Sequence, residues 1–233
     1  MTPEADRVRR YRTLRYRVRR SASPPPLPGD STRPPWDRAE VAAVGQFHAA
    51  GSDHRPRAEA RLLFDDRTLY VLFEVDDRYV RAVAQGFQGP VYEDSCVELF
   101  IRPRPGKGYF NVETNCGGTL LMYYIEDPRR TADGSARYQR LQPRDVEGLH
   151  IFHSLPSRVE PEIADPLRWS VSYGLPLELL ERYLGEPVRP GGGSWRGNFY
   201  KCGDKTSHPH WGSWSPIGEE LNFHQPERFG RLD

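Results

Sequence analysis

Two acidic residues, Glu98 and Glu113, lie in apolar segments where an unpaired buried carboxylate would be unfavourable. Apolar side chains take the odd positions in residues 97–101 and the even positions in residues 110–112. If both sets face one core, the numbers of any two residues that lie opposite each other on the two strands must have an odd sum. A turn centred near residue 105 makes that sum about 211. Glu98 is therefore predicted to lie directly opposite Glu113, on the other face of the sheet.

The face that carries the two glutamates is polar in other positions as well. It is predicted to include Cys96, Phe100, Asn111 and Asn115, with Tyr92 and Asp94 just upstream. Like charges directly opposite each other on a sheet are unfavourable, so the two glutamates need a partner that offsets the repulsion. That partner could be an arginine, a cation, a shared proton or a ligand rich in hydroxyl groups. Carboxylates and amides bind sugar hydroxyls, and aromatic rings cover the C–H face of a pyranose. These residue types favour non-catalytic carbohydrate binding, with a sugar held between aromatic side chains above a carboxylate and amide floor.

Two other functions use the same residues. Opposed carboxylates on neighbouring strands can approach the ~5–5.5 Å separation of a retaining glycosidase, so Glu98 and Glu113 could act as acid and base or nucleophile in a glycoside hydrolase. A structural or interaction domain could instead keep the fold without the sugar site, with an arginine paired to the glutamates. Turnover of aryl glycosides would distinguish the first alternative, and an arginine that fills the sugar space would distinguish the second.

The elements that must position these residues are short strands separated by turns rich in Gly and Pro, of which the 233 residues contain 21 and 22. Alternating or apolar runs predict strands at residues 11–20, 58–64, 68–77, 97–101, 109–115, 119–126, 149–155 and 167–176, and another within residues 191–204. Residues 127–148 are predicted to be a long polar loop, and residues 176–185 a helix with Pro176 near its start that ends at Gly185. The pattern predicts an all-β fold: an antiparallel jelly-roll or immunoglobulin-like β-sandwich with one short helix.

The N-terminal segment differs in composition from the rest of the chain. Residues 1–20 contain eight arginines and two acidic residues, whereas the remaining residues contain 25 basic and 30 acidic ones. We expect residues 1–26 to form a basic edge strand and a Pro-rich connector packed on the domain, with residues 27–233 as a single β-sandwich. An acidic body with a basic arm does not suit a nucleic-acid groove, so no nucleic-acid partner is expected.

The sequence also bears on location. No apolar run reaches ~18 residues, so no membrane-spanning segment is expected. The N-terminal residues lack the apolar region of a signal peptide, which predicts a cytoplasmic location by default, or an extracellular or periplasmic one if a leader was removed. The cysteines Cys96, Cys116 and Cys202 cannot all pair within one chain and are expected to be reduced and buried, with Cys96 inert.

Four stretches together resemble the family 9 carbohydrate-binding modules, in order and in spacing: "ARLLFDDRTLYVLFEVDD", "VYEDSCVELFIRP", "YFNVETNCGGTLL" and "NFHQPERFGRL". The resemblance extends from residue 27 to residue 233. It implies a jelly-roll-like sandwich, often with structural calcium, that binds a mono- or oligosaccharide. Better-known members are non-catalytic modules attached to xylan-degrading enzymes, which grip the reducing end of a glycan between two aromatic rings. The resemblance therefore implies a role in glycan degradation and carbohydrate catabolism beside such an enzyme.

The resemblance assigns roles to single residues of this chain. Tyr92 and Phe223 take the positions of the two rings, which are usually Trp in the sugar-binding members. Glu98 takes the position of the carboxylate that binds sugar hydroxyls, and Asn111 takes a polar strand position near which a basic residue is expected. The chain also carries insertions, including residues 128–148 and 185–193, that well-studied modules lack.

The remaining candidates come from loops. Asp76, Asp77 and Asp94 fall near one end of the predicted sheet and are candidate calcium ligands by their chemistry and by the resemblance. Trp214, in a loop that precedes Phe223, is a candidate for the sugar site, together with Trp211. The spacing of Cys202, His208 and His210 matches no standard zinc pattern and predicts a loop with hydrogen-bonded histidines.

Overall fold

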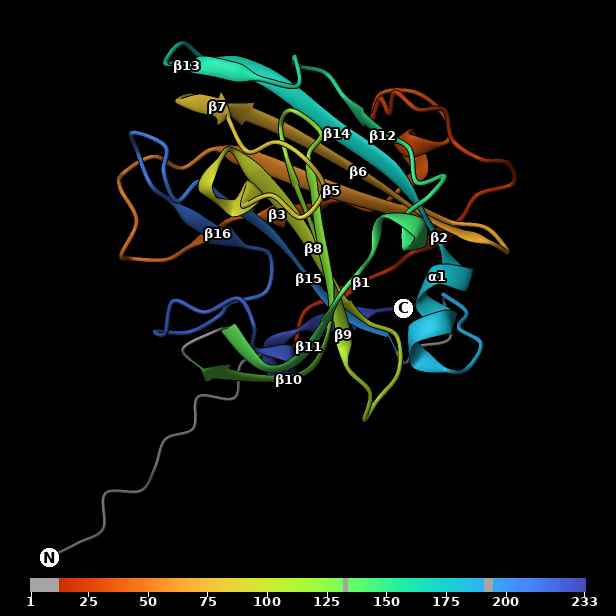
Figure 1. Cartoon of the computed structure of the whole chain (residues 1–233). Helices are drawn as coiled ribbons and strands as arrows, with labels where there is room; N and C mark the ends of the chain where they lie inside the picture. Colours follow the sequence, from red (N-terminus) through yellow and green to blue (C-terminus); the bar gives the residue numbers. More distant parts are fainter. Residues whose placement is uncertain (1–12, 132–133, 191–194) are drawn as a thin grey trace, which may run out of the picture.

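Two β-sheets form the layers of the computed structural model, which describes residues 13–131, 134–190 and 195–233 (Figure 1). Within these residues the larger sheet has nine strands, which follow the order β1 (Arg15–Tyr16), β17 (Gly230–Leu232), β15 (Trp195–Cys202), β8 (Cys96–Arg102), β9 (Tyr109–Asn115), β10 (Leu120–Thr131) and β11 (Gly134–Arg140), with β16 (Trp211–Ser213) beside β15 and β4 (Gln46–Phe47) beside β16. The second sheet has six strands, in the order β12 (Ile151–His153), β14 (Leu167–Pro176), β6 (Thr68–Asp77), β5 (Arg57–Phe64) and β2 (Arg19–Arg20), with β3 (Ala42–Val44) beside β5. A two-stranded ribbon joins β7 (Val80–Ala82) to β13 (Val159–Ile163).

The helical elements are short. Four 3-10 turns connect strands: η1 (Trp36–Arg38), η2 (Val91–Glu93), η3 (Pro143–Asp145) and η4 (Pro226–Arg228). In the described part of the chain the single α-helix is α1 (Leu177–Leu184). It ends at Gly185, whose φ of 74° lies in the left-handed region that glycine adopts most easily. Nearly all strand pairs are antiparallel, so the predicted β-sandwich with one short helix is confirmed; β1 with β17 and β2 with β5 are parallel exceptions.

The predicted register between β8 and β9 is confirmed. Glu98 pairs with Glu113, and Leu99 pairs with Val112. The odd-numbered apolar residues of β8 and the even-numbered ones of β9 lie in the core between the sheets, together with Phe73 of β6. Each fully buried side chain of this size contributes about 1.5–3 kcal/mol, and a slip of one residue would bring the glutamates into the core instead.

The basic N-terminal segment alternates as predicted within its described residues. Tyr16 and Val18 are buried, whereas Arg15, Arg17 and Arg19 are exposed. The segment forms two very short strands, and each joins a different sheet, so it closes one side of the sandwich. The first twelve residues lie outside the described part of the chain.

The predicted loop at residues 127–148 is wrong in its first half. β10 continues to Thr131, and β11 pairs with it as an antiparallel edge strand. The side chains of β11 are exposed or only half-buried, so this strand has no apolar stripe that could reveal it in the sequence. The hairpin extends the nine-stranded sheet beyond Glu113.

A buried ion pair joins the two sheets. Lys201 Nζ of β15 lies 3.3 Å from Asp77 Oδ2 of β6, and both side chains have no solvent exposure. Lys201 also donates to His210 Nε2 at 2.7 Å, while Asp77 accepts from His54 at 2.8 Å and from Trp169 Nε1 at 3.1 Å. Burial alone would raise the pKa of Asp77, but Lys201 and these hydrogen bonds hold it well below its usual range. Burial and Lys201 lower the pKa of His210 to about 3, so His210 is neutral and accepts from Lys201.

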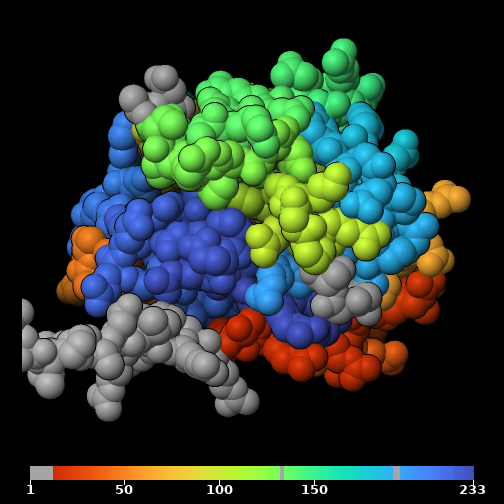
Figure 2. Space-filling model, turned by 90° about the horizontal axis from the view of Figure 1, so that it is seen from below, coloured from red at the N-terminus to blue at the C-terminus, as the bar shows by residue number. Residues whose placement is uncertain are grey.

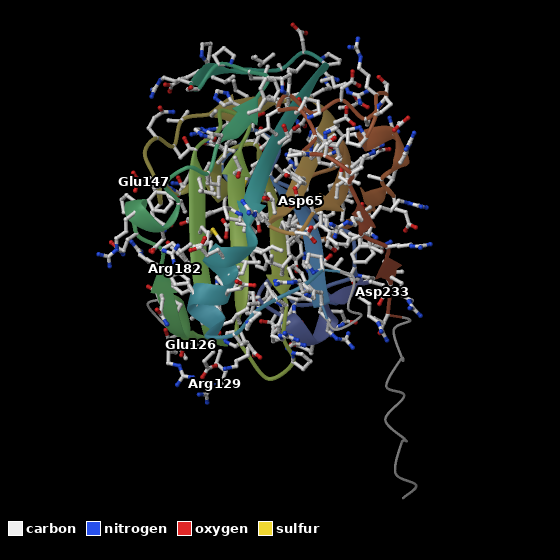
Figure 3. All side chains as sticks on the ribbon, turned by 90° about the vertical axis from the view of Figure 1, so that its right-hand side faces the viewer. Asp65, Glu126, Arg129, Glu147, Arg182 and Asp233 are labelled. Carbon is white, nitrogen blue, oxygen red and sulfur yellow. The ribbon has the colours of Figure 1, made fainter. Side chains whose placement is uncertain are left out.

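Many of the other charged residues lie around the outside of the sandwich, among them Asp65, Glu126, Arg129, Glu147, Arg182 and Asp233 (Figure 3). Among the described residues, no helix has both the length and the apolar character that crossing a membrane requires.

Candidate functional site

A cleft of about 480 Å³ opens on the face of the nine-stranded sheet that points away from the sandwich core. Its floor consists of side chains of β8, β9, β10 and β15 that alternate with the core-facing residues of the same strands. Its walls come from η2, from β11 and from the loops around residues 204–211 and 221–224. Figure 2 shows the molecule from below the view of Figure 1, where segments around residues 120–150 lie beside C-terminal segments.

The structure brings together most of the predicted site residues. Tyr92, Glu98, Asn111, Glu113 and Phe223 all line the cleft. Tyr92 extends from η2 and is 40% exposed. The Phe223 ring stacks on Tyr200, with 4.0 Å between ring centroids and an interplanar angle of 12°, and the Tyr200 hydroxyl donates to Phe223 O at 3.0 Å. The stacked ring of Tyr200 thus holds Phe223 in place from behind.

The two glutamates of the floor have few protein partners. Asn111 Nδ2 donates to Glu113 Oε1 at 2.6 Å, and Asn111 Oδ1 in turn accepts from the backbone N–H of Tyr123 at 2.8 Å. Glu98 Oε1 accepts from the Cys202 thiol at 3.1 Å. Within the residues that the structure describes, neither glutamate forms an ion pair with Arg, Lys or His. An arginine that neutralises the pair, as expected for a structural domain without a sugar site, is therefore not seen there.

Burial changes the protonation of this floor. Burial, together with the neighbouring Cys202 and Glu113, raises the pKa of Glu98 well above its usual value. Burial raises the pKa of Glu113 to about 7, although the hydrogen bond from Asn111 opposes the rise. Near neutral pH the floor therefore carries carboxyl groups that can donate as well as accept, which matches the hydroxyl groups of a sugar.

Several further residues of the cleft were missed in the sequence. They join Trp211, which was a candidate in the sequence and which lines the cleft and donates from Nε1 to Asp204 Oδ1 at 2.7 Å. Tyr138 of β11 lies 5.4 Å from Tyr123, centroid to centroid, and the guanidinium of Arg140 lies 5.4 Å from the Tyr123 ring centroid. The residues of β11 were missed because their segment carries no strand pattern.

Trp214, by contrast, does not line the cleft. It is buried in the sandwich core, where its ring packs edge-on against Tyr16, with 6.4 Å between centroids, and against Phe199 at 5.6 Å. The prediction that Trp214 belongs to the sugar site is therefore wrong, and Trp211 takes its place in the wall. Both tryptophans occur in the same Gly- and Ser-rich stretch, so the sequence did not distinguish core from cleft.

The three carboxylates predicted to hold calcium do not form a common site. Each has protein donors of its own: Asp76 pairs with Arg57 at 3.3 Å; Asp77 pairs with Lys201 at 3.3 Å; and Asp94 pairs with Arg81 at 3.1 Å and accepts from the backbone N–H of Val83 and Ala84 and from Asn115 Nδ2. Calcium needs six to eight oxygen ligands around one point, whereas these oxygens are engaged by cations and N–H groups. The residues therefore do not fit a calcium ion.

A β-sandwich whose cleft combines aromatic rings with carboxyl and amide groups has the chemistry of a carbohydrate-binding module. Residues 35–233 match the sequence model of carbohydrate-binding family 9. The chain belongs to this family.

Solved structures support the assignment of the fold. A candidate carbohydrate-binding protein from Bacteroides uniformis ATCC 8492 is 28% identical, with a TM-score of 0.78 over 95% of this chain and 99% of the other. A family 9 module from Caldicellulosiruptor kristjanssonii in complex with cellotriose is 16% identical, with a TM-score of 0.57 over 94% of this chain and 93% of the module. A family 9 module from Caldicellulosiruptor kristjanssonii in complex with glucose is also 16% identical, with a TM-score of 0.54 over 94% of this chain and 95% of the module. No protein with a curated description matches the chain.

Proposed function

We propose that the cleft binds a mono- or oligosaccharide and holds it without cleaving it. In this proposal a pyranose ring packs between Tyr92 and Phe223, while its hydroxyl groups hydrogen-bond to Glu98, Asn111 and Glu113. The observation that carries the proposal is the floor itself: two buried carboxyl groups without a cationic partner in the described chain, beneath the exposed ring of Tyr92 and the half-buried ring of Phe223. Family membership supports it, as do the cellotriose and glucose complexes of the Caldicellulosiruptor kristjanssonii module.

The energetics of the floor favour a ligand rich in hydroxyl groups. Glu98 and Glu113 are 2% and 5% exposed, and each accepts one hydrogen bond from the described residues. A carboxyl group has capacity for more hydrogen bonds than this, and incomplete pairing of buried polar groups is costly. Sugar hydroxyls would complete these bonds, whereas an apolar ligand would leave them unmade.

The placement of the glutamates argues against a hydrolase. Glycosidases flank the scissile bond with their two carboxyl groups. Glu98 and Glu113 are directly paired on adjacent strands of the floor, so both approach a ligand from the same side. We therefore expect no turnover of aryl glycosides, and turnover abolished by either Glu→Gln substitution would contradict the proposal.

We further propose a role in carbohydrate catabolism in which the chain keeps a glycan-degrading enzyme near a substrate such as xylan. Support comes from the family alone. Titration with xylotriose beside cellotriose would show whether the cleft accepts the xylose backbone.

Replacing Tyr92 by Ala should weaken saccharide binding about 5–30-fold, because a stacked aromatic ring contributes roughly 1–2 kcal/mol beyond simple burial. Isothermal titration calorimetry with glucose, cellotriose and xylotriose would measure this, with Glu98→Ala as a second variant from the floor. Val41→Ala offers a control, since Val41 is an exposed apolar residue outside the cleft. Absence of heat with every sugar, or unchanged affinity in both cleft variants, would refute the proposed function.

Saccharide affinity should rise with pH through about 7. Glu113 has its pKa near 7, and its ionised form accepts hydroxyl hydrogen bonds roughly twice as strongly as a neutral acceptor. Calorimetry between about pH 5.5 and pH 8.5 should show the rise, and Glu113→Gln should flatten it. An affinity that falls over this range in the wild-type protein would show that the protonated carboxyl group is the form that binds.

A further inference from the structure

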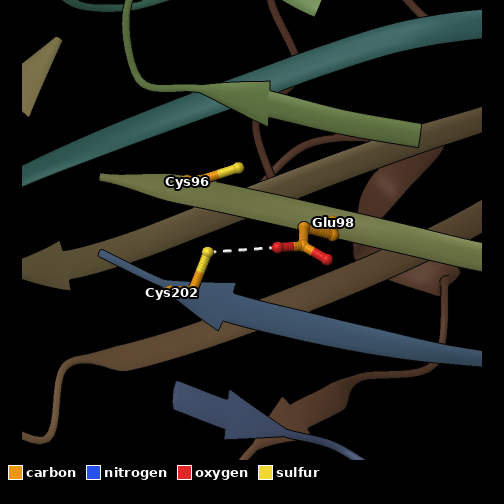
Figure 4. Close-up of side chains that lie close together, drawn as sticks. All are labelled: Cys96, Glu98 and Cys202. Carbon is orange, nitrogen blue, oxygen red and sulfur yellow. Dashed lines mark hydrogen bonds between the residues drawn. The ribbon is translucent and has the colours of Figure 1, made fainter. Parts of the chain in front are cut away.

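Two cysteines and one glutamate converge at the edge of the cleft floor. The sulfur atoms of Cys96 and Cys202 and a carboxylate oxygen of Glu98 all lie within 4.8 Å of one another (Figure 4). Cys96 and Glu98 are two residues apart on β8 and so share a face, and Cys202 is the direct partner of Cys96 on β15. The three side chains are therefore held by neighbouring strands of one sheet rather than by loops.

The sugar site does not account for this arrangement. Sugar binding uses the Glu98 carboxyl group but needs no thiol, and both cysteines are free. The one hydrogen bond to Glu98 within the described residues comes from the Cys202 thiol. A carboxyl group that is 2% exposed and bonded only to a weak S–H donor is poorly compensated. A bound cation would compensate it fully.

The donor set indicates which cation. Two sulfur ligands with one carboxylate suit a thiophilic ion such as Zn²⁺, whereas calcium and magnesium prefer oxygen ligands alone. Zinc lies ~2.3 Å from sulfur and ~2.0–2.2 Å from carboxylate oxygen, so tetrahedral ligand atoms lie roughly 3.5–3.8 Å apart. The observed separations, 3.1 Å between Cys202 Sγ and Glu98 Oε1 and at most 4.8 Å among all three ligand atoms, bracket these values.

The cluster is also accessible from the cleft. Glu98 and Cys202 line the cleft, while Cys96 lies behind them with no exposure. Lys201, the nearest lysine along the chain, points to the opposite face of β15 and pairs with Asp77 in the core. An ion at the cluster would have three protein ligands and a fourth position toward the cleft, as zinc sites with an exchangeable ligand do.

We propose that Cys96, Cys202 and Glu98 form a binding site for Zn²⁺ or a similar thiophilic divalent cation, with its fourth coordination position open to the cleft. The ion would engage the Glu98 carboxyl group that the sugar site also uses. Metal and sugar affinities are therefore linked, and each ligand must change the affinity for the other by the same factor.

The test uses Co²⁺ as a spectroscopic probe for Zn²⁺ on the reduced, metal-free protein in the absence of sugar. We expect one Co²⁺ per chain, with the intense charge-transfer absorption of thiolate ligands and the visible bands of a tetrahedral site, and displacement of Co²⁺ by Zn²⁺. Cys96→Ser and Cys202→Ser should abolish the charge-transfer absorption. Loss of a residue that only hydrogen-bonds to a metal ligand typically weakens metal binding ~10–100-fold. Because Glu98 is proposed as a ligand itself, Glu98→Gln should weaken Zn²⁺ binding by more than this.

Cys116→Ser is the matched control, because Cys116 is an equally buried free thiol that lies outside the cluster. It should bind Co²⁺ as the wild-type protein does. The proposal would be overturned if the wild-type protein with Co²⁺ showed no thiolate charge-transfer absorption. It would also be overturned if Cys96→Ser and Cys202→Ser both gave the same Co²⁺ spectrum as the wild-type protein. Should the serine variants not fold, X-ray absorption at the zinc edge of the wild-type protein decides: two sulfur ligands support the site, and none refutes it. Because no sugar is present, failure here is independent of failure of the sugar titrations.

Discussion

Replacing Lys201 by Met should lower the free energy of unfolding by about 3–5 kcal/mol. Lys201 and Asp77 have no solvent exposure, and their ion pair links β15 of one sheet to β6 of the other. Methionine fills similar volume but leaves Asp77 as a buried charge with only His54, Trp169 and a backbone N–H as donors. The expected loss comes mainly from that uncompensated charge rather than from the attraction itself.

Urea unfolding at neutral pH would measure the effect, with Lys205→Met as a control. Lys205 pairs with Glu93 at 2.9 Å but its side chain is 62% exposed, so its loss should cost less than about 1 kcal/mol. The double variant Lys201→Met with Asp77→Asn should recover part of the loss, because it removes both charges. Equal effects of the two lysine substitutions would show that the buried pair has no special role.

Replacing Glu113 by Gln should remove the contribution of one titrating group to the pH dependence of stability between about pH 4.5 and 7, and above that range the variant should be more stable than the wild-type protein. Burial raises the pKa of Glu113 from 4.5 to about 7, so between these values the folded state binds more protons than the unfolded state. This group therefore lowers the free energy of unfolding by up to about 3 kcal/mol as pH rises through this window, so the wild-type protein should lose that much stability relative to the Glu113→Gln variant. Glutamine cannot ionise, yet its Oε1 can still accept the hydrogen bond from Asn111.

Urea unfolding at about pH 5 and about pH 8 would test this expectation. Glu147→Gln provides the control, since Glu147 lies at the surface and should leave the wild-type pH dependence unchanged (Figure 3). A difference in stability between the wild-type protein and Glu113→Gln that is the same at both pH values, or a Glu113→Gln variant less stable than the wild-type protein at pH 8, would contradict the account of the floor.

The parts of the fold that could be predicted are those in which apolar periodicity is strong. In β8 and β9 the alternation fixes which residues face the core, and the turn length fixes the register, so the pairing of Glu98 with Glu113 followed from the sequence. α1 was predictable for a similar reason, because Leu177, Leu180 and Leu184 recur at helical spacing before Gly185. Local pattern is sufficient where burial on one face decides the structure.

The parts that could not be predicted depend on contacts between distant residues. β11 is a polar edge strand that owes its position to pairing with β10. The predicted calcium ligand Asp77 meets Lys201, which is 124 residues away along the chain. Cys96 and Cys202 become neighbours only because β8 and β15 are adjacent in the sheet. No local spacing rule encodes any of these contacts.

The most direct test of sugar binding in this cleft is a crystal structure of the protein soaked with cellotriose. The account predicts a pyranose ring between Tyr92 and Phe223, with hydroxyl groups within hydrogen-bond distance of Glu113 and Asn111. A sugar bound elsewhere on the surface, or a cleft closed by the side chain of Arg130 or Arg140 and without sugar, would contradict it.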